Sequence, residues 1–269
     1  MSGPQPDKSF EHQIQDKTIE NTLKRVKHKI LVLSGKGGVG KSTVAVNLAV
    51  GLAGKDRKVG LIDVDLHGPS VPRMLGLTGG FQAGEKPKPM SWSPNLSVVS
   101  IEPLLPDHDK AVIWRGPIKI GVIRQFISDL EWDELDYLVV DSPPGTGDEP
   151  LTVAQTIPGA QALIVTTPQE VALADVRKSI DFCHQVNMPI LGLIENMNGM
   201  VCPHCGKPVE FFKSGGGSNL AKTSGLPLIS SVPFVQGIVK AGDTGQPDSK
   251  PFEEMVSRVI ERMEGEKAG

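Results

Sequence analysis

Short runs of consecutive hydrophobic residues recur along the chain, and longer stretches with helical spacing separate them. Within each run the hydrophobic residues are continuous rather than alternating with polar ones. Such runs are typical of strands that are buried on both faces of a parallel sheet. They predict strands at residues 29–34, 58–63, 96–101, 137–142, 162–167, 190–196 and 227–233.

The stretches between these runs have the spacing of amphipathic helices. They predict helices at residues 41–53, 117–130, 172–186 and 217–224. A last helix near the C-terminus should dock on the sheet, because its hydrophobic side chains form one stripe: Phe252, Met255, Val256, Val259, Ile260 and Met263. Strands that alternate with helices predict an α/β fold of three layers, in which helices flank a mostly parallel central sheet.

The chain shows no internal repeat and no linker between two units. Its 269 residues, of which 39% are hydrophobic, are enough for one large core. We therefore expect residues 29–269 to form a single domain. Residues 1–28 are mostly polar, and we expect them to form a flexible N-terminal segment.

Composition argues against several classes of function. The net charge is −3, from 28 basic and 31 acidic side chains, so no global positive field attracts nucleic acid or anionic lipid. No hydrophobic run approaches the length of a membrane span. The three cysteines cannot form a disulfide framework. We therefore expect a cytoplasmic protein that binds neither nucleic acid nor membranes.

The sequence GKGGVGKST follows the first predicted strand and precedes the first predicted helix. This is the pattern and the context of a phosphate-binding loop (P-loop), in which glycines let backbone N–H groups converge on phosphate oxygens. Lys41 should contact the β- and γ-phosphates of ATP, and the Ser42 hydroxyl should ligate Mg²⁺. Lys36 could reach a nucleotide across a dimer interface, as an arginine finger does. The predicted nucleotide-binding residues of the loop are Gly35, Lys36, Gly37, Gly38, Val39, Gly40, Lys41, Ser42 and Thr43.

Carboxylates end two of the predicted strands, at the edge where parallel sheets bind ligands. Asp141 closes one strand and should be a partner of Mg²⁺, because this ion uses few protein oxygens and keeps several waters. Asp65 is the candidate for orienting or deprotonating the attacking water. Asp63 should lie at the nucleotide, with capping of the strand end as the alternative. Together with Lys36 and Lys41, Asp65 and Asp141 are the predicted catalytic residues.

Cys202 and Cys205 form a C-x-x-C pair in a chain with one other cysteine. A structural zinc site needs four ligands, and His204 would be a strained third one. A redox dithiol would favour the start of a helix in a thioredoxin-like pattern. An iron–sulfur cluster needs four thiolates, which two subunits related by a twofold axis would supply. Cys183 lies on the hydrophobic face of a predicted helix, where we expect a small core residue.

Several motifs together carry a resemblance to a known family. SGKGGVGKST resembles the deviant phosphate-binding motif of the MinD, ParA and nitrogenase iron protein class. DVDLHGPSVPRMLG, WRGP, DSPPGTGDEPLT, IENM and CPHCG are more specific and resemble the Mrp/ApbC family of iron–sulfur cluster carrier ATPases. The resemblance covers roughly residues 29–263, which is almost the whole chain.

This resemblance implies a P-loop NTPase fold and a homodimer that binds ATP. It also implies a [4Fe–4S] cluster at the dimer interface, held by Cys202 and Cys205 of each subunit. Lys36 would act across the dimer, and Asp65 and Asp141 match the switch I and Walker B positions. Adenine would be recognised by Asn196, with the loop from Pro233 to Val235 nearby.

The predicted function is therefore that of a slow ATPase that assembles or transfers a [4Fe–4S] cluster to apo iron–sulfur proteins. A MinD- or ParA-like positioning ATPase is one alternative, but it would favour a basic amphipathic C-terminal helix or a basic patch. An ATP-dependent electron-transfer protein is the other alternative. Sequence separates it poorly from a carrier, because both hold a bridged cluster.

Overall fold

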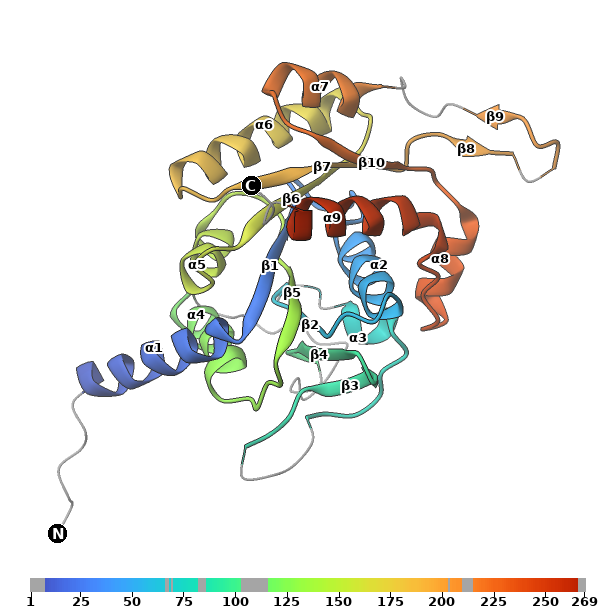
Figure 1. Cartoon of the computed structure of the whole chain (residues 1–269). Coiled ribbons are helices and arrows are strands. Elements are labelled where there is room, and N and C mark those ends of the chain that lie inside the picture. The colour runs from blue at the N-terminus through green and yellow to red at the C-terminus, as the bar shows by residue number, and fades with distance from the viewer. Residues whose placement is uncertain are drawn as a thin grey trace, which may run out of the picture.

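The computed structural model of the chain describes residues 8–65, 68, 70–81, 86–102, 116–202, 204–209 and 215–265. Its main sheet has the strand order β10-β7-β6-β1-β5-β2-β4-β3, and a second, two-stranded sheet pairs β8 with β9 (Figure 1). The strands are β1 (Val26–Leu33), β2 (Val59–Asp63), β3 (Met90–Ser93), β4 (Leu96–Ser100), β5 (Leu135–Asp141), β6 (Gln161–Thr166), β7 (Ile190–Asn196), β8 (Met200–Val201), β9 (Pro208–Val209) and β10 (Leu228–Val232).

Neighbouring strands of the main sheet are parallel, except that β3 is antiparallel to β4. The predicted α/β fold with a mostly parallel sheet is thus confirmed. The helices are α1 (Lys8–Lys24), α2 (Lys41–Gly54), α3 (Val71–Met74), α4 (Gly116–Ser128), α5 (Asp148–Thr156), α6 (Glu170–Gln185), α7 (Gly216–Ser224), α8 (Gln236–Asp243) and α9 (Glu253–Gly265).

Two hydrophobic cores lie on opposite faces of the main sheet. Successive residues of β1 alternate between them: Leu31 and Leu33 belong to one core, and Ile30 and Val32 to the other. The first core includes side chains of α1, α4, α5, α6 and α7, and the second those of α2, α3 and α9. Because both faces are covered, the strands need hydrophobic residues at successive positions, as their sequences show.

The predicted docking of the C-terminal helix on the sheet is confirmed. Met255, Val256, Val259 and Met263 of α9 are buried in the second core. Cys183 is fully buried in the first core, as expected. The Trp114 and Arg115 positions of the WRGP motif lie outside the described residues.

We expected residues 1–28 to form a flexible segment, but residues 8–28 are mostly in regular secondary structure. Residues 8–24 form helix α1, and Val26 already begins β1. Ile19 and Leu23, one helical turn apart, are buried in the first core. Most of the helix is polar and Ile14 is exposed, so this two-residue stripe was too short to stand out in the sequence.

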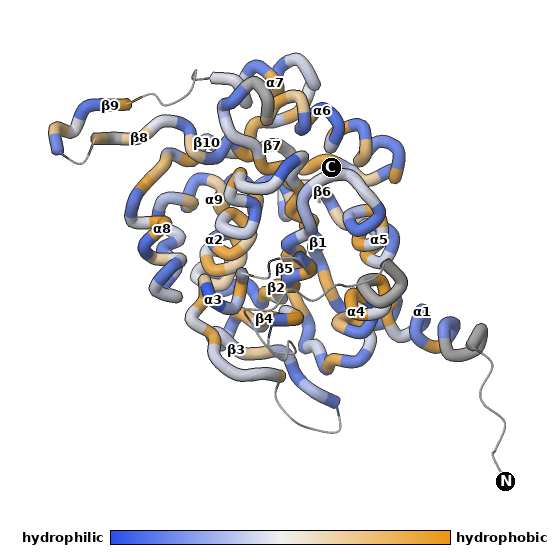
Figure 2. Tube along the Cα trace, turned by 180° about the vertical axis from the view of Figure 1, so that it is seen from behind, coloured by the Kyte–Doolittle hydropathy of each residue, from blue (hydrophilic) through white to orange (hydrophobic). Residues whose placement is uncertain are grey.

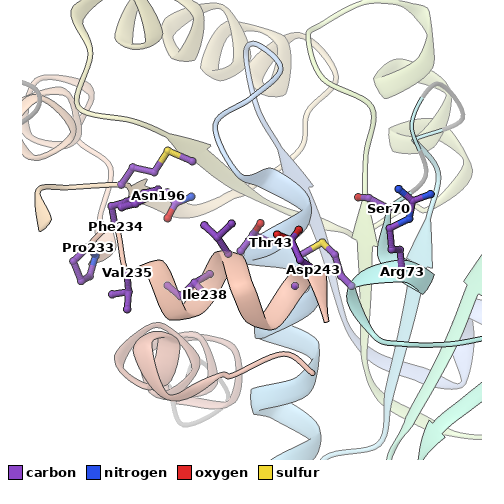
Figure 3. A pocket seen from close by; sticks show the side chains of 13 residues that line it. Thr43, Ser70, Arg73, Asn196, Pro233, Phe234, Val235, Ile238 and Asp243 are labelled. Atoms are coloured by element: carbon purple, nitrogen blue, oxygen red, sulfur yellow. The ribbon is translucent and has the colours of Figure 1, made fainter. Parts of the chain in front are cut away.

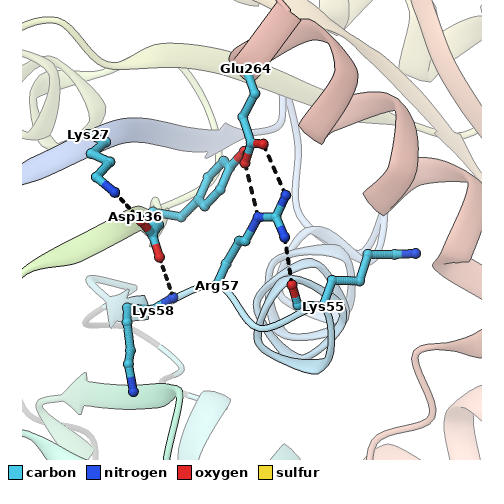
Figure 4. A network of polar contacts seen from close by, with 7 residues as sticks. Lys27, Lys55, Arg57, Lys58, Asp136 and Glu264 are labelled. Atoms are coloured by element: carbon cyan, nitrogen blue, oxygen red, sulfur yellow. Dashed lines mark hydrogen bonds and ion pairs between the residues drawn. The ribbon is translucent and has the colours of Figure 1, made fainter.

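A polar network anchors α9 at the sheet edge where β2 and β5 begin (Figure 4). The Arg57 guanidinium donates to both carboxylate oxygens of Glu264, at 3.1 and 3.0 Å, and the Tyr137 hydroxyl donates to Glu264 at 2.9 Å. Hydrogen bonding from Arg57 lowers the pKa of Glu264. This edge lies opposite the carboxyl ends of the strands, so the network supports the fold and leaves the predicted site open.

The β8–β9 hairpin extends away from the main sheet. Figures 1 and 2 view the chain from opposite sides, and both show the hairpin projecting beyond the body of the molecule. Figure 2 also shows hydrophobic and hydrophilic residues on α8, a helix without buried residues. The hairpin was not predicted from the sequence, since two strands of two residues each carry no periodic pattern.

Candidate nucleotide site and cysteine hairpin

The phosphate-binding loop lies between β1 and α2, as its sequence predicted. Gly38 and Gly40 adopt positive φ angles of 80° and 82°, a conformation that side-chain-bearing residues rarely adopt. A Cβ atom at position 40 would also collide with the side-chain amide of Asn196. The loop therefore needs glycine at position 40 both for its backbone conformation and for its contact with β7.

Lys41 lies buried among carboxylates at the carboxyl edge of the sheet. Its ammonium group is 2.6 Å from Asp141 Oδ1 and 3.7 Å from Asp65 Oδ2. The second oxygen of Asp141, Oδ2, is buried without a hydrogen-bond partner. A buried carboxylate oxygen with free accepting capacity suits a ligand of Mg²⁺. The structure thus brings the predicted residues Lys41, Asp65 and Asp141 together, with Ser42 beside Lys41 at 3.4 Å.

Asp63 is fully buried and lies beside Asp141, its register partner on the neighbouring strand. Its Oδ1 accepts from the Asp65 N–H at 3.1 Å, and its Oδ2 accepts from Val71 N–H and Ser100 Oγ, both at 3.3 Å. Asp63 thus caps the end of its strand, which is the alternative role that the sequence left open for it. Its hydrogen bonds orient the turn that carries Asp65 and the start of α3.

The pKa of Asp63 predicts a pH-dependent stability. This pKa is raised from 3.8 to about 8, mainly by burial of the carboxyl group and next by the neighbouring Asp141. Lys41 lowers it, but by less than these two effects raise it. Between these values the folded chain keeps a proton that the unfolded chain has released, so stability falls as the pH rises through the window. We expect the melting temperature of the nucleotide-free protein to fall between about pH 5 and about pH 8, and to fall less steeply for Asp63→Asn.

The matched control is Asp148→Asn, since Asp148 is an exposed carboxylate at the start of α5. This variant should keep the wild-type slope of melting temperature against pH. An Asp63→Asn variant with the same slope as the wild type would contradict the assignment of the proton to Asp63.

A pocket of about 270 Å³ lies beside the phosphate-binding loop (Figure 3). Its walls come from the start of α2, from α3, from the end of β7, and from α8 and the segment that leads into it. Thr43, Asn196, Pro233 and Val235 line it, so four of the residues predicted to bind the nucleotide meet at one cavity, while Asp63 and the other predicted loop residues are not part of its lining. Sequence reasoning missed other lining residues, which include Ser70, Arg73, Phe234, Ile238 and Asp243.

Asn196 joins this pocket to the phosphate-binding loop, because its side-chain amide donates to the Val39 carbonyl at 2.9 Å. Lys36 lies on the other side of the loop and donates to Gln169 Oε1 at 3.4 Å. Lys36 is half-buried within one chain, and its action across a dimer stays a prediction.

The cysteine pair lies at the tip of the β8–β9 hairpin. The Cys202 N–H donates to the Lys207 carbonyl, and the Gly206 N–H donates back to the Cys202 carbonyl, each at 2.9 Å. Cys202 is half-buried and Cys205 is exposed. Hydrogen bonds from the N–H of His204, then from Cys205, lower the pKa of the Cys202 thiol. A lowered thiol pKa favours the thiolate, which is the metal-binding form.

These environments predict a pattern of alkylation by iodoacetamide. Cys202 and Cys205 should react in the folded protein, and Cys202 should reach half its maximal rate at a lower pH than an unstructured cysteine peptide. Cys183 should stay unmodified until the chain unfolds, because burial raises its pKa to about 12. Peptide mass spectrometry over a pH series measures all three residues. Early labelling of Cys183 would contradict the described core.

Among the residues that the structure describes, no group of three or more His, Cys, Asp and Glu side chains could hold a metal ion. Within the described part of a single chain, Cys202 and Cys205 therefore remain a pair. An apolar groove of about 530 Å³ lies between the hairpin base and α8, and Met200, Phe234 and Val235 are among its lining residues. This groove shares Pro233, Phe234, Val235 and Val239 with the pocket beside the phosphate-binding loop.

The strand order, the glycine loop before α2 and the buried Lys41–Asp141 pair define a P-loop NTPase with a MinD- or ParA-like fold. Solved structures agree: the cell division ATPase MinD of Pyrococcus furiosus aligns with a TM-score of 0.64 at 22% identity, over 89% of this chain and 99% of that one. At this identity the likeness shows the fold alone. A family model described as NUBPL iron-transfer P-loop NTPase matches residues 25–264, and the chain belongs to this family.

Curated relatives agree with this family. The chain is 47% identical to the iron-sulfur cluster carrier protein of Methanocaldococcus jannaschii, over 94% of this chain and 91% of that protein. It is 50% identical to the cytosolic Fe-S cluster assembly factor Nubp2 homolog of Anopheles gambiae, over 83% and 89%. A nucleotide-binding protein of Archaeoglobus fulgidus in complex with ADP aligns with a TM-score of 0.76 at 40% identity, over 86% and 91%. The resemblance to iron–sulfur carrier ATPases is thereby confirmed.

Proposed function

We propose that this protein is an ATP-dependent carrier that receives a [4Fe–4S] cluster and transfers it to apo iron–sulfur proteins. The observation that carries this proposal is the cysteine pair at the tip of a projecting hairpin, on a chain of the iron-transfer P-loop NTPase family. An exposed tip allows the thiols to reach a second protein. A cluster buried in the core would have no route to an acceptor.

Two chains together would supply the four thiolates that a cluster requires, because each chain offers Cys202 and Cys205. A twofold axis that relates the two hairpins would bring one cysteine pair from each chain to the same place. Backbone N–H donors to Cys202 support this role, since hydrogen bonds to ligand sulfurs stabilise the thiolate and tune the cluster. The homodimer thus belongs to the proposal, and so does the action of Lys36 across it.

The nucleotide part of the proposal rests on the carboxyl edge of the sheet. Lys41 would bind the β- and γ-phosphates, and Ser42 and Asp141 would hold Mg²⁺. Asp65, 3.7 Å from the Lys41 ammonium, would orient the attacking water. Turnover should be slow in the absence of an acceptor, because catalysis by positioning needs an ordered dimer.

The test is anaerobic reconstitution with iron and sulfide, followed by mixing with the apo form of a [4Fe–4S] ferredoxin. A carrier loses its cluster as the acceptor gains iron and sulfide in equal amounts, and the reconstituted protein should be a dimer by light scattering. An acceptor that gains electrons without iron would instead support the electron-transfer alternative. A chain that stays monomeric and colourless after reconstitution would contradict the proposal.

Nothing in the described part of the chain favours the positioning-ATPase alternative over the carrier. The hydrophobic stripe of α9 is buried against the sheet and is not free to bind a membrane surface. Within the described residues, no helix has the length and the hydropathy needed to cross a membrane.

A further inference from the structure

The segment that carries the cysteine pair leaves the sheet at the end of β7 and returns to it at the start of α7. Both ends of this segment meet at one side chain, Glu195, which is 1% exposed. The Asn198 side-chain amide donates to Glu195 Oε2 at 2.8 Å. At the other end, the Gly217 N–H donates to Glu195 Oε1 at 2.6 Å. One carboxylate therefore holds the two ends together.

The return end is fitted closely around this carboxylate. A Cβ atom at Gly217 would lie 2.8 Å from Glu195 Oε1, closer than real Cβ contacts. Position 217 therefore needs glycine if its N–H is to reach the carboxylate. A third donor, Ser231 Oγ on β10, reaches Glu195 Oε2 at 2.9 Å and belongs to neither end of the segment.

The next residue of β7 points to the nucleotide pocket. Asn196 lines the pocket and bonds to the phosphate-binding loop through Val39. The hairpin base is also bonded to the pocket wall, since the Phe234 N–H donates to the Gly199 carbonyl at 2.8 Å. Two consecutive residues of β7 thus have different partners. Asn196 lines the pocket and bonds to the phosphate-binding loop, and Glu195 bonds to both ends of the segment that carries the cysteines.

We infer that Glu195 is a positioning residue of the cysteine site, which fixes both ends of the hairpin segment and links its mobility to nucleotide occupancy. This inference rests on the proposed carrier function and adds a route of regulation to it. Nucleotide in the pocket restrains the end of β7 and the Pro233–Val235 wall, and the hairpin base is restrained with them. Because such coupling is reciprocal, a bound cluster must change nucleotide affinity by the same factor.

The test uses Glu195→Gln, which keeps the size of the side chain but offers one accepting oxygen in place of two. The first readout is the rate at which the reconstituted protein loses iron to a coloured ferrous chelator, with and without Mg·ADP. Wild-type protein should lose iron at a rate that depends on nucleotide. The variant should lose iron about tenfold faster, because a buried donor is left unpaired, and the effect of ADP should shrink to about twofold or less.

The matched control is Ser231→Ala, which removes the one donor to Glu195 that holds neither end of the segment. It should keep the wild-type rates and the wild-type response to ADP. If Glu195→Gln does not fold, Asn198→Ala removes the side-chain bond to Glu195 at one end of the segment, at a half-buried position, and should shift the rates in the same direction. Wild-type rates and a wild-type ADP response in Glu195→Gln, or equal effects in Ser231→Ala, would overturn the inference.

A second readout does not depend on the cluster, so it separates this inference from the proposed function. Amide hydrogen exchange at Cys202 and Gly206, which are bonded across the hairpin, should slow when Mg·ADP is added to the cluster-free protein. In Glu195→Gln the exchange at these two amides should be about tenfold faster than in the wild type and should not depend on ADP. The exchange rates of the β6 amides should be the same in the variant and the wild type. If neither ADP nor the substitution changes the exchange rates at Cys202 and Gly206, the inference is wrong, even if the protein is shown to transfer a cluster.

Discussion

Replacing Cys202 with alanine is expected to abolish cluster retention and to leave the nucleotide affinity equal to that of the cluster-free wild type. The chain contributes a pair of thiols, so the variant dimer would offer two sulfur ligands to a cluster that requires four. The candidate nucleotide pocket lies at the base of the hairpin, away from the tip that carries the cysteines, and Cys202 is not part of its lining. Visible absorbance after anaerobic reconstitution measures the first effect, and ADP titration measures the second.

The control for this substitution is Cys183→Ala, which removes a thiol that is fully buried in the core. That variant should retain the cluster, although it is expected to lose some stability because a small cavity forms. Cys205→Ala should behave like Cys202→Ala. Full cluster absorbance in either hairpin variant would show that the sulfur ligands lie elsewhere.

Replacing Lys41 with methionine is expected to have the largest effect at the nucleotide site. Lys41 is 6% exposed, and its ammonium group lies 2.6 Å from a buried oxygen of Asp141. Without it, ATP hydrolysis should fall by about 10²–10³-fold, as for the loss of one preorganised transition-state donor. The nucleotide-free chain should also lose about 3–5 kcal/mol of stability, because the buried carboxylate loses its cation.

The comparison variant is Lys36→Met. The Lys36 ammonium donates to Gln169 over 3.4 Å, and among the described residues it has no buried carboxylate as a partner. This variant should therefore keep the stability of the nucleotide-free chain and lose hydrolysis in the dimer. Urea unfolding and phosphate release separate the two quantities. A Lys41→Met chain as stable as the wild type would show that the Asp141 pair contributes no net stability.

Much of the fold could be predicted because its strands are buried on both faces. All seven predicted strands are present in the structure, with ends that differ by a few residues. The missed elements lack a long hydrophobic pattern. Helix α5 begins with DEP, and a proline in a first turn is compatible with a helix but resembles a turn in sequence. Helix α8 spans only eight residues, which is too short for its hydrophobic spacing to stand out in the sequence.

The candidate site was predictable in part for the same reason. Lys41, Asp65 and Asp141 lie in motifs whose spacing follows from phosphate and metal chemistry, and the structure brings them together. Arg73 and Asp243 line the pocket from elements far apart in the chain, and no local motif marks them. Glu195 lies near the end of a strand, and nothing in the sequence distinguishes it from other polar residues at strand ends.

The sequence by itself determined the parallel sheet, the phosphate-binding loop and the presence of one cysteine pair. Each of these depends on residues that are neighbours in the chain, so a local pattern is enough to specify it. Only the tertiary structure decided that the pair stands on a projecting hairpin and that Glu195 joins the hairpin's two ends. It also placed Asn196 between the pocket and the phosphate-binding loop. These relations depend on contacts between distant segments, which form only when the sheet brings its strand ends to one edge.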